Sequence, residues 1–240
     1  MKPTASRTFD CVIANPPFSL KSWGAENWAN DPFGRNIAGV PPNGNGDMAW
    51  VQHMIRSMNS TGRMTVVLPH GALFRKGAEG HIRKALLEQD LLEAVIGLGS
   101  NIFYGTSLAA CVMVFKQLKE EDRKGKVLFI DASEQIRTGR AQNYLEAEHV
   151  QQIYDWYQAF EDVENYVKVA SMDDLAENDF NLNIPLYVEK IIEDDLPSVE
   201  EALADLKEAW AESLKAEEKF KEKLSQFFTT DSADFHRLKP

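Results

Sequence analysis

Short runs of apolar residues recur through the first half of the chain and predict the strands of a sheet. The first run, FDCVIA at residues 9–14, is almost continuously apolar, which is typical of a strand buried on both faces of a parallel sheet. The runs at residues 91–97 and 108–115 are separated by only a loop, so we expect an antiparallel pair there. Residues 63–69 and 126–131 predict two further strands.

Helical spacing of apolar residues fills the intervals between these runs. We expect Asp47 to cap a helix that the Thr-Gly pair at residues 61–62 ends, with an inner face made of Val51, Met54, Ile55 and Met58. Residues 79–89 and 146–160 predict two more helices, and residues 182–188 predict a short extended segment. Strands that alternate with helices indicate an α/β fold.

The pattern changes in the last fifth of the chain, where residues 196–228 predict one long amphipathic helix. Its apolar residues follow one heptad register, broken at Ser213 and Glu217: they are Leu203, Leu206, Trp210, Phe220, Leu224 and Phe227. This register favours docking in a coiled coil or helical bundle, and a helix folded back on its own domain is the alternative. We therefore expect two parts, residues 1–190 and a helical tail of residues 191–240.

The charge is distributed very unevenly along the chain. The net charge is −11, but residues 1–120 carry a net of +3 and residues 121–240 a net of −14. Nucleic-acid binding proteins neutralise phosphates with Lys and Arg, so this chain alone is a poor candidate for strong DNA binding. Binding of DNA then requires another subunit or further sequence.

Composition otherwise fits an ordinary globular protein, with 44% hydrophobic and 26% charged residues. No apolar run approaches the roughly 20 residues that span a membrane, and the N-terminus lacks the apolar core of a secretory signal. Cys11 and Cys111 each lie within an apolar run, so we expect both to be buried, reduced thiols. These features predict a cytoplasmic protein.

The first predicted strand runs directly into Asn15-Pro16-Pro17-Phe18. Ligands bind at the carboxyl ends of strands in open α/β sheets, so this is a favourable place for chemistry. The two prolines fix their own φ angles and restrict the residue before each, which holds the segment rigid. A simple turn is the alternative, but an aromatic residue directly after the prolines favours a binding site.

This tetrapeptide suits an exocyclic amino group on a base. Such a nitrogen is a poor nucleophile because its lone pair is delocalised into the ring. The Asn15 side-chain oxygen and the Pro16 carbonyl can accept hydrogen bonds from its two N–H groups, which draws the nitrogen towards tetrahedral geometry. Phe18 can stack on a base that has been turned out of the helix. Asn15, Pro16, Pro17 and Phe18 are therefore the predicted catalytic residues.

The segment FDCVIANPPF resembles the catalytic motif of amino-methyltransferases. The stretches GDMAWVQHMI, GRMTVVLPHGALFRKGAEGHIRKALL, LEAVIGLGSNIFYGTSLAACVMVF, VLFIDAS and NDFNLNIPLYV resemble, in order, the modification subunit of type I restriction–modification systems. The resemblance covers about residues 9–188. It implies an N-6 adenine-specific DNA methyltransferase with S-adenosylmethionine as cofactor. The implied partners are DNA, the specificity and restriction subunits, and a second modification subunit.

The same resemblance implies a Rossmann-like methyltransferase sheet, of which this chain contains only the later part. In that family the Gly-rich cofactor loop precedes the Asn-Pro-Pro-Phe motif, whereas only eight residues precede Phe9 here. Gly97-Leu98-Gly99 is a poor substitute, since a nucleotide-binding loop should open a helix. Asn15 and Pro16 remain as the edge of a cofactor site, so we expect weak or absent cofactor binding. A fragment, a truncated product and half of a split enzyme all fit.

Other residues are candidates of lower specificity. Phe103 lies on a loop at the same predicted sheet end as Phe18, where it either stacks on the target base or packs on the core. Lys21, Arg35, Arg75 and Lys76 are candidate phosphate contacts, although scattered surface charge is the default explanation for them. Trp23 and Trp28 either order the long loop on DNA or cover apolar surface. The five histidines lack the spacing of metal ligands.

The sequence is therefore compatible with three functions. The first is adenine methylation in a type I complex. The second is an inert assembly fragment, which the missing cofactor loop and the acidic tail suggest. The third is methylation of an RNA base or a protein glutamine, because the same acceptors suit other planar nitrogens.

Overall fold

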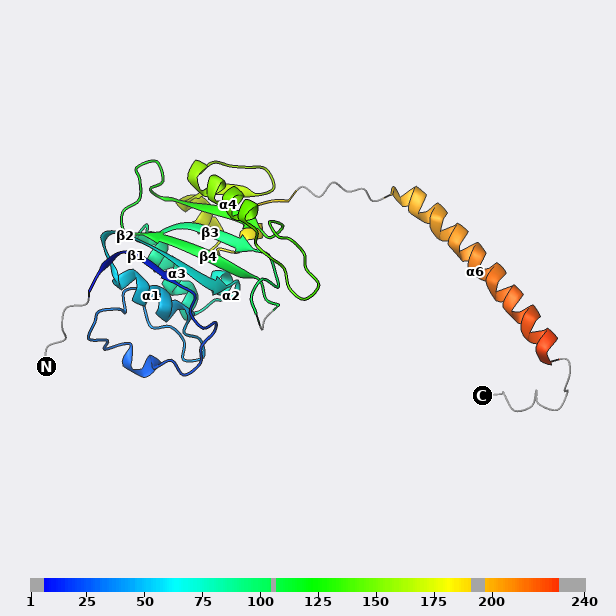
Figure 1. Cartoon of the computed structure of the whole chain (residues 1–240), viewed down its shortest axis with the longest axis horizontal. Helices are drawn as coiled ribbons and strands as arrows, with labels where there is room; N and C mark the ends of the chain where they lie inside the picture. Colours follow the sequence, from blue (N-terminus) through cyan, green and yellow to red (C-terminus); the bar gives the residue numbers. More distant parts are fainter. Residues whose placement is uncertain (1–6, 105–106, 191–196, 229–240) are drawn as a thin grey trace. The chain divides into compact units, whose positions relative to one another are not determined.

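The computed structural model describes residues 7–104, 107–190 and 197–228 of the chain (Figure 1). The chain divides into two compact units, Met1–Ile191 and Ile192–Pro240. The first is an α/β unit, and the second contains helix α6, Val199–Phe228. The predicted boundary between residues 190 and 191 lies next to residues 191–196, which are outside the described ranges.

The α/β unit is built on a mixed six-stranded sheet of order β1-β2-β4-β3-β5-β6. The strands are β1 (Phe9–Ala14), β2 (Met58–Pro69), β3 (Leu92–Leu98), β4 (Ala110–Lys116), β5 (Lys126–Ala132) and β6 (Val167–Ser171). β1 pairs with β2, and β3 with β5, in parallel, whereas the other three pairings are antiparallel. The α/β class and the antiparallel pair β3–β4 are confirmed, and β6 was not predicted.

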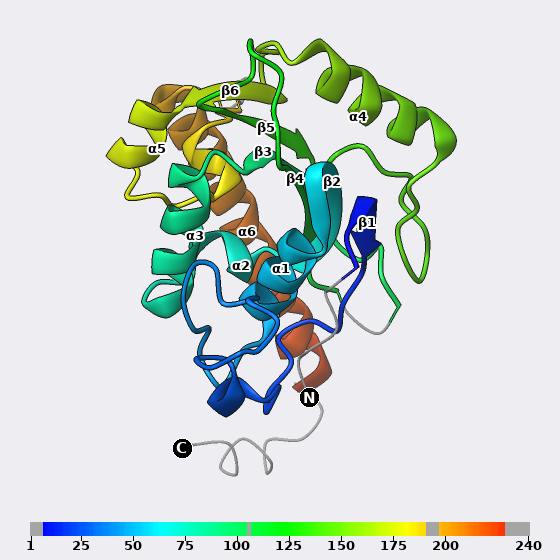
Figure 2. The ribbon, with the colours of Figure 1, turned by 90° about the vertical axis from the view of Figure 1, so that its left-hand side faces the viewer.

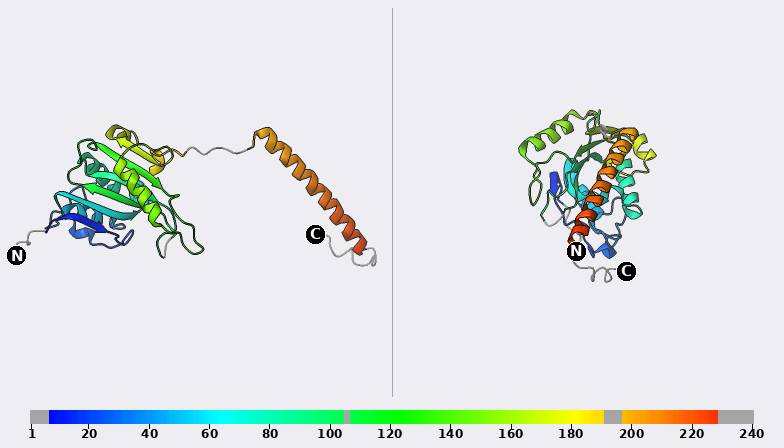
Figure 3. Two further views of the ribbon diagram at one scale, coloured as in Figure 1. Left: turned by 45° about the horizontal axis from the view of Figure 1, so that its top comes forward. Right: turned by 90° about the vertical axis from the view of Figure 1, so that its right-hand side faces the viewer.

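Helices cover both faces of the sheet, but unequally. The helices of this unit are α1 (Asp47–Arg56), α2 (Gly71–Phe74), α3 (Ala78–Glu88), α4 (Ala147–Ala159) and α5 (Met172–Glu177), with 3₁₀ turns η1 (Ala25–Asn27) and η2 (Ile184–Leu186). α1, α2, α3 and α5 lie on one face (Figure 2). α4 crosses the other face, against β5 (Figure 3).

Two hydrophobic clusters follow from this layering. Alternate residues of β5 point to opposite faces, so Phe129 joins the cluster under α1, α3 and α5, whereas Leu128 and Ile130 join the cluster under α4. Every residue of β3 is buried, because this strand has a neighbour on each side and cover on both faces. The core therefore centres on β3 and β5.

Strand β1 differs from its prediction. Phe9 is 53% exposed, Ile13 is 76% exposed and Cys11 is exposed, so the expected burial of this strand on both faces is wrong. β1 forms an edge of the sheet and pairs only with β2 in the described structure. Val12 and Ala14 pack partly against the cluster on the α1 side. An apolar run specifies a strand, but burial depends on the neighbours that it acquires.

The start of β2 also departs from the sequence prediction. α1 ends at Arg56, and Met58 already belongs to β2, so residues 61–62 lie in a strand and do not end the helix. A Cβ on Gly62 would approach the Phe9 carbonyl oxygen to 2.9 Å, so glycine permits the close approach of β1. The segment predicted as extended at residues 182–188 instead contains the turn η2. No helix in the described ranges is long and apolar enough to cross a membrane.

Candidate acceptor site

The Asn-Pro-Pro-Phe segment follows β1 at the carboxyl end of the sheet. β1 and β2 are parallel and remain in register to Ala14 and Val66, so both strands deliver their following loops to one place. Asn15 and Pro17 are exposed, Pro16 is buried and Phe18 is half-buried. The buried proline anchors the segment while its neighbours face outward.

Both predicted hydrogen-bond acceptors are open. Within the described residues, neither the Asn15 side-chain oxygen nor the Pro16 carbonyl oxygen accepts a hydrogen bond. The segment therefore has two acceptors that a ligand amino group could use, on a backbone that prolines stiffen.

Phe18 meets Phe103, which comes from a distant part of the chain. The two ring centroids are 6.1 Å apart at an interplanar angle of 73°, an edge-to-face contact. Phe103 follows β3, which runs in the same direction as β1 and β2, so its loop reaches the same end of the sheet. Phe103 is half-buried against the cluster under α4, so it packs on the core and also touches Phe18.

A buried carboxylate holds the chain directly after Phe18. The Ser19 N–H donates to Asp47 Oδ1 at 2.7 Å, and Asp47 Oδ2 accepts from the Arg75 guanidinium. Asp47 is fully buried at the first residue of α1, and Gly46 occupies the cap position, so the predicted capping role of Asp47 is wrong. Sequence patterns did not reveal this tether, because a carboxylate before an apolar helix face reads as a cap.

Arg75 is fixed in turn by a second carboxylate and by close packing. Its Nε donates to Glu79 Oε2 at 2.7 Å. Burial opposes its charge, but the hydrogen bonds and charges of Glu79 and Asp47 outweigh burial and raise the pKa of Arg75. A Cβ on Gly71 would lie 2.3 Å from Arg75 Nη1, so a larger residue at the start of α2 would displace the guanidinium from this position. We name Asp47, Arg75 and Glu79 the carboxylate–arginine tether.

The long loop between Phe18 and α1 is ordered by its own contacts. Trp23 and Trp28 meet edge-to-face at 5.3 Å, and the Trp23 indole N–H donates to the Pro42 carbonyl at 2.9 Å. Gln52 of α1, which is buried, accepts from the Ala38 N–H at 2.9 Å and donates to the Gly39 carbonyl at 2.9 Å. These contacts assign the tryptophans to loop packing, and Trp28 is almost fully buried.

The four candidate phosphate contacts have different surroundings. Arg35 pairs with Asp31 and lies over the Trp28 ring, and Arg75 belongs to the tether. Lys21 and Lys76 are exposed and have no ion-pair partner within the described ranges. Of the four candidates, Lys21 and Lys76 are therefore the more available for contact with a phosphate.

Neither Gly97 nor Gly99, at the end of β3, lies beside open space that a cofactor could occupy. A Cβ on Gly97 would meet Ile184 Cδ1 at 2.5 Å, and one on Gly99 would meet the Ser133 carbonyl oxygen at 2.8 Å. Protein atoms therefore fill the space beside both glycines. The loop after β3 leads to an antiparallel strand and opens no helix. In the part of the chain that is described, no three His, Cys, Asp or Glu side chains could hold a metal ion.

Comparison with known proteins places this architecture in a family. Residues 1–195 match the N-6 DNA Methylase family. The chain is 37% identical over 226 residues to the methylase subunit of the type I restriction enzyme MjaVII from Methanocaldococcus jannaschii, covering 90% of this chain and 38% of the relative. It is 33% identical to the HindI methylase subunit from Haemophilus influenzae, covering 91% of this chain and 51% of the relative.

Solved structures agree with the sequence matches. The type I restriction–modification methyltransferase subunit from Streptococcus thermophilus superposes with a TM-score of 0.72 at 38% identity, over 78% of this chain and 40% of that chain. The EcoKI M protein shares the fold, with a TM-score of 0.57 at 20% identity over 96% of this chain. The chain spans about two fifths to one half of the length of these relatives. The resemblance noted in the sequence is confirmed: this chain belongs to the N-6 DNA methylase family, alongside methylase subunits of type I restriction enzymes.

Proposed function

We propose that this chain supplies the acceptor half of an adenine N6 DNA methyltransferase within a type I restriction–modification complex. The observation that carries the proposal is the Asn-Pro-Pro-Phe segment at the carboxyl end of β1, with two open acceptors and Phe103 against Phe18. The relatives named as type I methylase subunits support the same assignment.

In this proposal the adenine amino group donates its two N–H groups to the Asn15 side-chain oxygen and the Pro16 carbonyl. These hydrogen bonds localise the nitrogen lone pair and direct it away from the ring plane, towards an electrophilic methyl group. Phe18 stacks on the extruded base, and the edge of Phe103 limits the rotation of the Phe18 ring. The amine loses a proton after attack, and solvent at the exposed Asn15 receives it.

The methyl donor of the proposed reaction is S-adenosylmethionine, which supplies a sulfonium-activated methyl group when bound. Asn15 and Pro16 would form only one edge of its site. We propose that the remainder of the site comes from residues outside the described ones, in an enzyme as long as the relatives. Among the described residues no strand pairs with the outer edge of β1, and Ile13 is exposed. Both support this proposal, because a parallel strand with an apolar exposed face is favourable for further pairing.

The carboxylate–arginine tether has a positioning role in this proposal. Asp47 holds the backbone one residue after Phe18, and Arg75 connects that point to the segment between α2 and α3. Preorganised groups catalyse best when a supporting set of contacts fixes their geometry. Loss of the tether should therefore disturb the orientation of Phe18 more than that of Asn15.

Helix α6 supports the proposed docking with other subunits of the complex. It spans 30 residues, and the apolar side chains Leu203, Leu206, Trp210, Phe220 and Leu224 are all exposed. The side chain of Phe227, the last predicted member of the register, lies outside the described ones. An amphipathic helix with an uncovered apolar stripe is suited to a coiled coil or bundle with the specificity subunit. A DNA duplex and the restriction subunit would complete the assembly.

The main test uses a complete modification subunit that contains this chain, assembled with its specificity subunit and substrate DNA. Asn15→Ala should slow methyl transfer by about a hundredfold or more, as for other lost transition-state hydrogen bonds. The matched control is Asn59→Ala, because Asn59 lies near the amino end of β2, at the opposite end of the sheet. Full methyl transfer by Asn15→Ala, or transfer to RNA or protein with none to DNA, would refute the proposal.

Two further measurements separate the acceptor half from the helical tail. Calorimetry with S-adenosylmethionine should give no micromolar binding to this 240-residue chain, and such binding would contradict the division of the cofactor site. Deletion of residues 196–228 should abolish assembly with the specificity subunit and leave the circular dichroism of the α/β unit intact. Unchanged assembly would refute the docking role of α6.

A further inference from the structure

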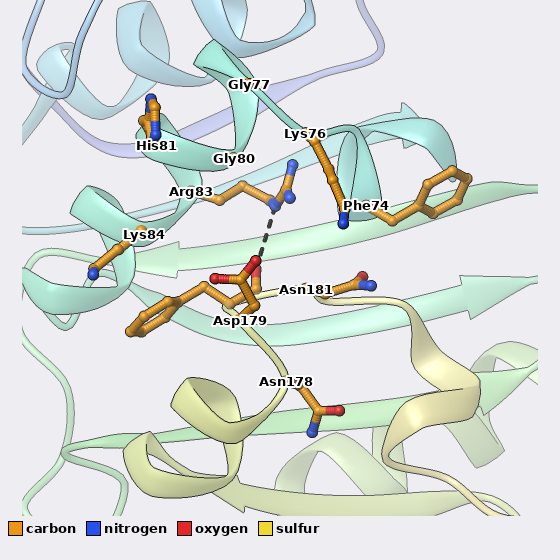
Figure 4. Close-up of a pocket in the computed structure, with 11 residues that line it drawn as sticks. Phe74, Lys76, Gly77, Gly80, His81, Arg83, Lys84, Asn178, Asp179 and Asn181 are labelled. Carbon is orange, nitrogen blue, oxygen red and sulfur yellow. Dashed lines mark hydrogen bonds between the residues drawn. The ribbon is translucent and has the colours of Figure 1, made fainter.

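A pocket of about 350 Å³ lies beside α3, between its first turns and the segment that follows α5 (Figure 4). Lys76, Arg83 and Lys84 line it from the α3 side, and Asp179 and Asn181 line it from the other. This volume is within the range of small-molecule sites. None of these residues belongs to the Asn-Pro-Pro-Phe segment or to the carboxylate–arginine tether.

Arg83 forms the buried part of this pocket and lacks a neutralising partner. It is 4% exposed, yet no carboxylate of the described residues lies within ion-pair distance of it. Its Nη1 donates to the Arg75 carbonyl at 2.7 Å and to the Ala72 carbonyl at 3.3 Å, and Nε points to the Phe180 carbonyl at 3.5 Å. Nη2 donates to no described acceptor.

This arrangement leaves a buried positive charge without an ion-pair partner among the described residues. Burial is the main cause that lowers the pKa of Arg83, and the charge of Arg75 adds to it, whereas Glu79 and Asp179 act in the opposite direction. A buried cation that is bonded only to neutral carbonyls is costly, and an anion in contact with it offsets that cost. Arg83 lines the pocket and is therefore a candidate contact for an anionic ligand there.

The rim of the pocket adds charge of the same sign. Lys76 has no ion-pair partner in the described ranges, whereas Lys84 lies over the Phe180 ring at 4.9 Å and forms an ion pair with Glu88 at 3.8 Å. Three cationic side chains and one carboxylate, Asp179, line the pocket, and Glu88 pairs with Lys84 beside it, which leaves one net positive charge. Asn181 also lines the pocket, and its side-chain nitrogen donates to no described acceptor.

We propose that this pocket binds the phosphate group of a nucleotide. Arginine and lysine together suit a tetrahedral oxyanion, since guanidinium offers a planar pair of donors and ammonium a compact charge. The cavity is larger than a phosphate group alone, and Phe74 at its rim is 44% exposed, which provides a flat apolar surface for a sugar or base. The phosphate comes either from a DNA strand or from a free nucleotide. The site stands independently of the proposed methyl transfer.

The first experiment titrates the 240-residue chain with thymidine 5′-monophosphate, inorganic phosphate and thymidine by calorimetry or NMR. A pyrimidine nucleotide avoids the proposed adenine site. Both phosphates should bind and thymidine should not. Lys76→Ala should weaken thymidine monophosphate binding by about tenfold, and Asp179→Asn should strengthen it by about threefold. Asn15→Ala should leave it unchanged, which separates this site from the acceptor site.

The matched control is Lys124→Ala, which removes the same charge from an exposed lysine outside the pocket. Equal weakening by Lys124→Ala and Lys76→Ala would overturn the proposal, because total charge would then explain binding. Binding of thymidine as tight as that of its monophosphate, weaker binding by Asp179→Asn, or no phosphate binding at millimolar concentration would also overturn it.

A second experiment identifies the source of the phosphate in the complete, assembled enzyme with a DNA duplex. The measured quantity is the slope of the logarithm of the DNA-binding constant against the logarithm of the salt concentration. If a DNA phosphodiester occupies the pocket, Lys76→Ala should make this slope shallower by about one unit. An unchanged salt dependence, together with weakened nucleotide binding, would assign the pocket to a free nucleotide. Failure of Asn15→Ala to slow methylation would leave both outcomes intact.

Discussion

Strands β1 and β3 have similar local sequences and very different surroundings. FDCVIA and LEAVIGL are both short apolar runs, yet every residue of β3 is buried whereas Phe9, Cys11 and Ile13 of β1 are exposed. β3 lies between β4 and β5 and is covered on both faces, but β1 has one neighbour and one covered face. The segment with the proposed chemistry follows the exposed strand. The exposed apolar strand beside the proposed acceptor segment is the surface at which we propose that further structure pairs.

The largest expected contrast is in thiol reactivity. Cys111 lies in β4, fully buried, and burial raises its pKa to about 12, whereas Cys11 is exposed on β1. A rise of this size above the ordinary value of 9.0 leaves roughly a thousandfold less thiolate at neutral pH. When the native chain is labelled with an aromatic disulfide reagent, the reaction with Cys11 should rapidly release one equivalent of aromatic thiolate per chain. The second equivalent, from Cys111, should appear only on unfolding.

Cys11→Ser should remove the rapid phase, and Cys111→Ser should leave it unchanged. In a complete enzyme that pairs a further strand with β1, the rapid phase should be slowed. Rapid release of two equivalents from the native chain would refute the burial of β4. An equally rapid phase in the complete enzyme would show that the β1 surface remains open there.

The second contrast uses the same residue type on the two strands. Ile96 of β3 is 8% exposed and Ile13 of β1 is 76% exposed. Ile96→Ala should lower the free energy of unfolding of the α/β unit by about 2–5 kcal/mol, because it opens a cavity in the core under α4. Ile13→Ala should change it by less than about 0.5 kcal/mol. Urea unfolding followed by near-ultraviolet circular dichroism measures both, and equal costs would contradict the edge position of β1.

The existence of these strands could be predicted from sequence, but their burial could not. Apolar runs specify β1, β3 and β5 because strand formation is local, whereas exposure depends on which elements pack beside each strand. β6 was missed because VKVAS offers only a weak alternation over five residues. The segment around Pro185 was read as extended from its apolar residues, yet the chain forms the turn η2 there.

In the candidate site, too, one contact could be predicted from the sequence and another could not. The meeting of Phe18 and Phe103 could be anticipated, because parallel strands deliver their following loops to one end of the sheet. The contact between Asp47 and Arg75 could not, since 28 residues separate the two and no periodic pattern connects them. The sequence offers Arg75 as a candidate phosphate contact, and the structure shows its guanidinium bound to two carboxylates.

The third prediction concerns this tether, which fixes the loop after the exposed strand. Asp47→Asn keeps the shape of the side chain and removes its charge from the Ser19 N–H and from Arg75. We expect a loss of about 1–3 kcal/mol in the free energy of unfolding, measured by urea titration, because a buried charged hydrogen bond is lost. Asp162→Asn is the matched control: Asp162 pairs with Lys168 at an exposed site, where about 0–1 kcal/mol is expected. Equal losses would show that Asp47 contributes no more than a surface pair.

The smallest effect is expected at β6, the opposite edge of the sheet from β1. There Ser171 caps α5: its hydroxyl accepts from the Asp174 N–H at 3.2 Å, and the Asp174 carboxylate accepts from the Ser171 N–H at 2.7 Å. Hydrogen bonds from the backbone and hydroxyl of Ser171 lower the pKa of Asp174 below its ordinary value of 3.8. The carboxylate therefore adds stability above pH 3.8, and this contribution is lost as the pH falls through the folded-state pKa.

Asp174→Asn should accordingly cost at most about 1 kcal/mol at pH 7, since the group is exposed. The difference from the native chain should shrink as urea titrations are repeated from pH 7 down to pH 3. Asp173→Asn is the control, because Asp173 is exposed in the same turn and accepts no described hydrogen bond. A difference for Asp174→Asn that stayed constant with pH would exclude the charged cap. In that case the segment after β6 would lack a charged carboxylate contact of the kind that Asp47 makes with the segment after β1.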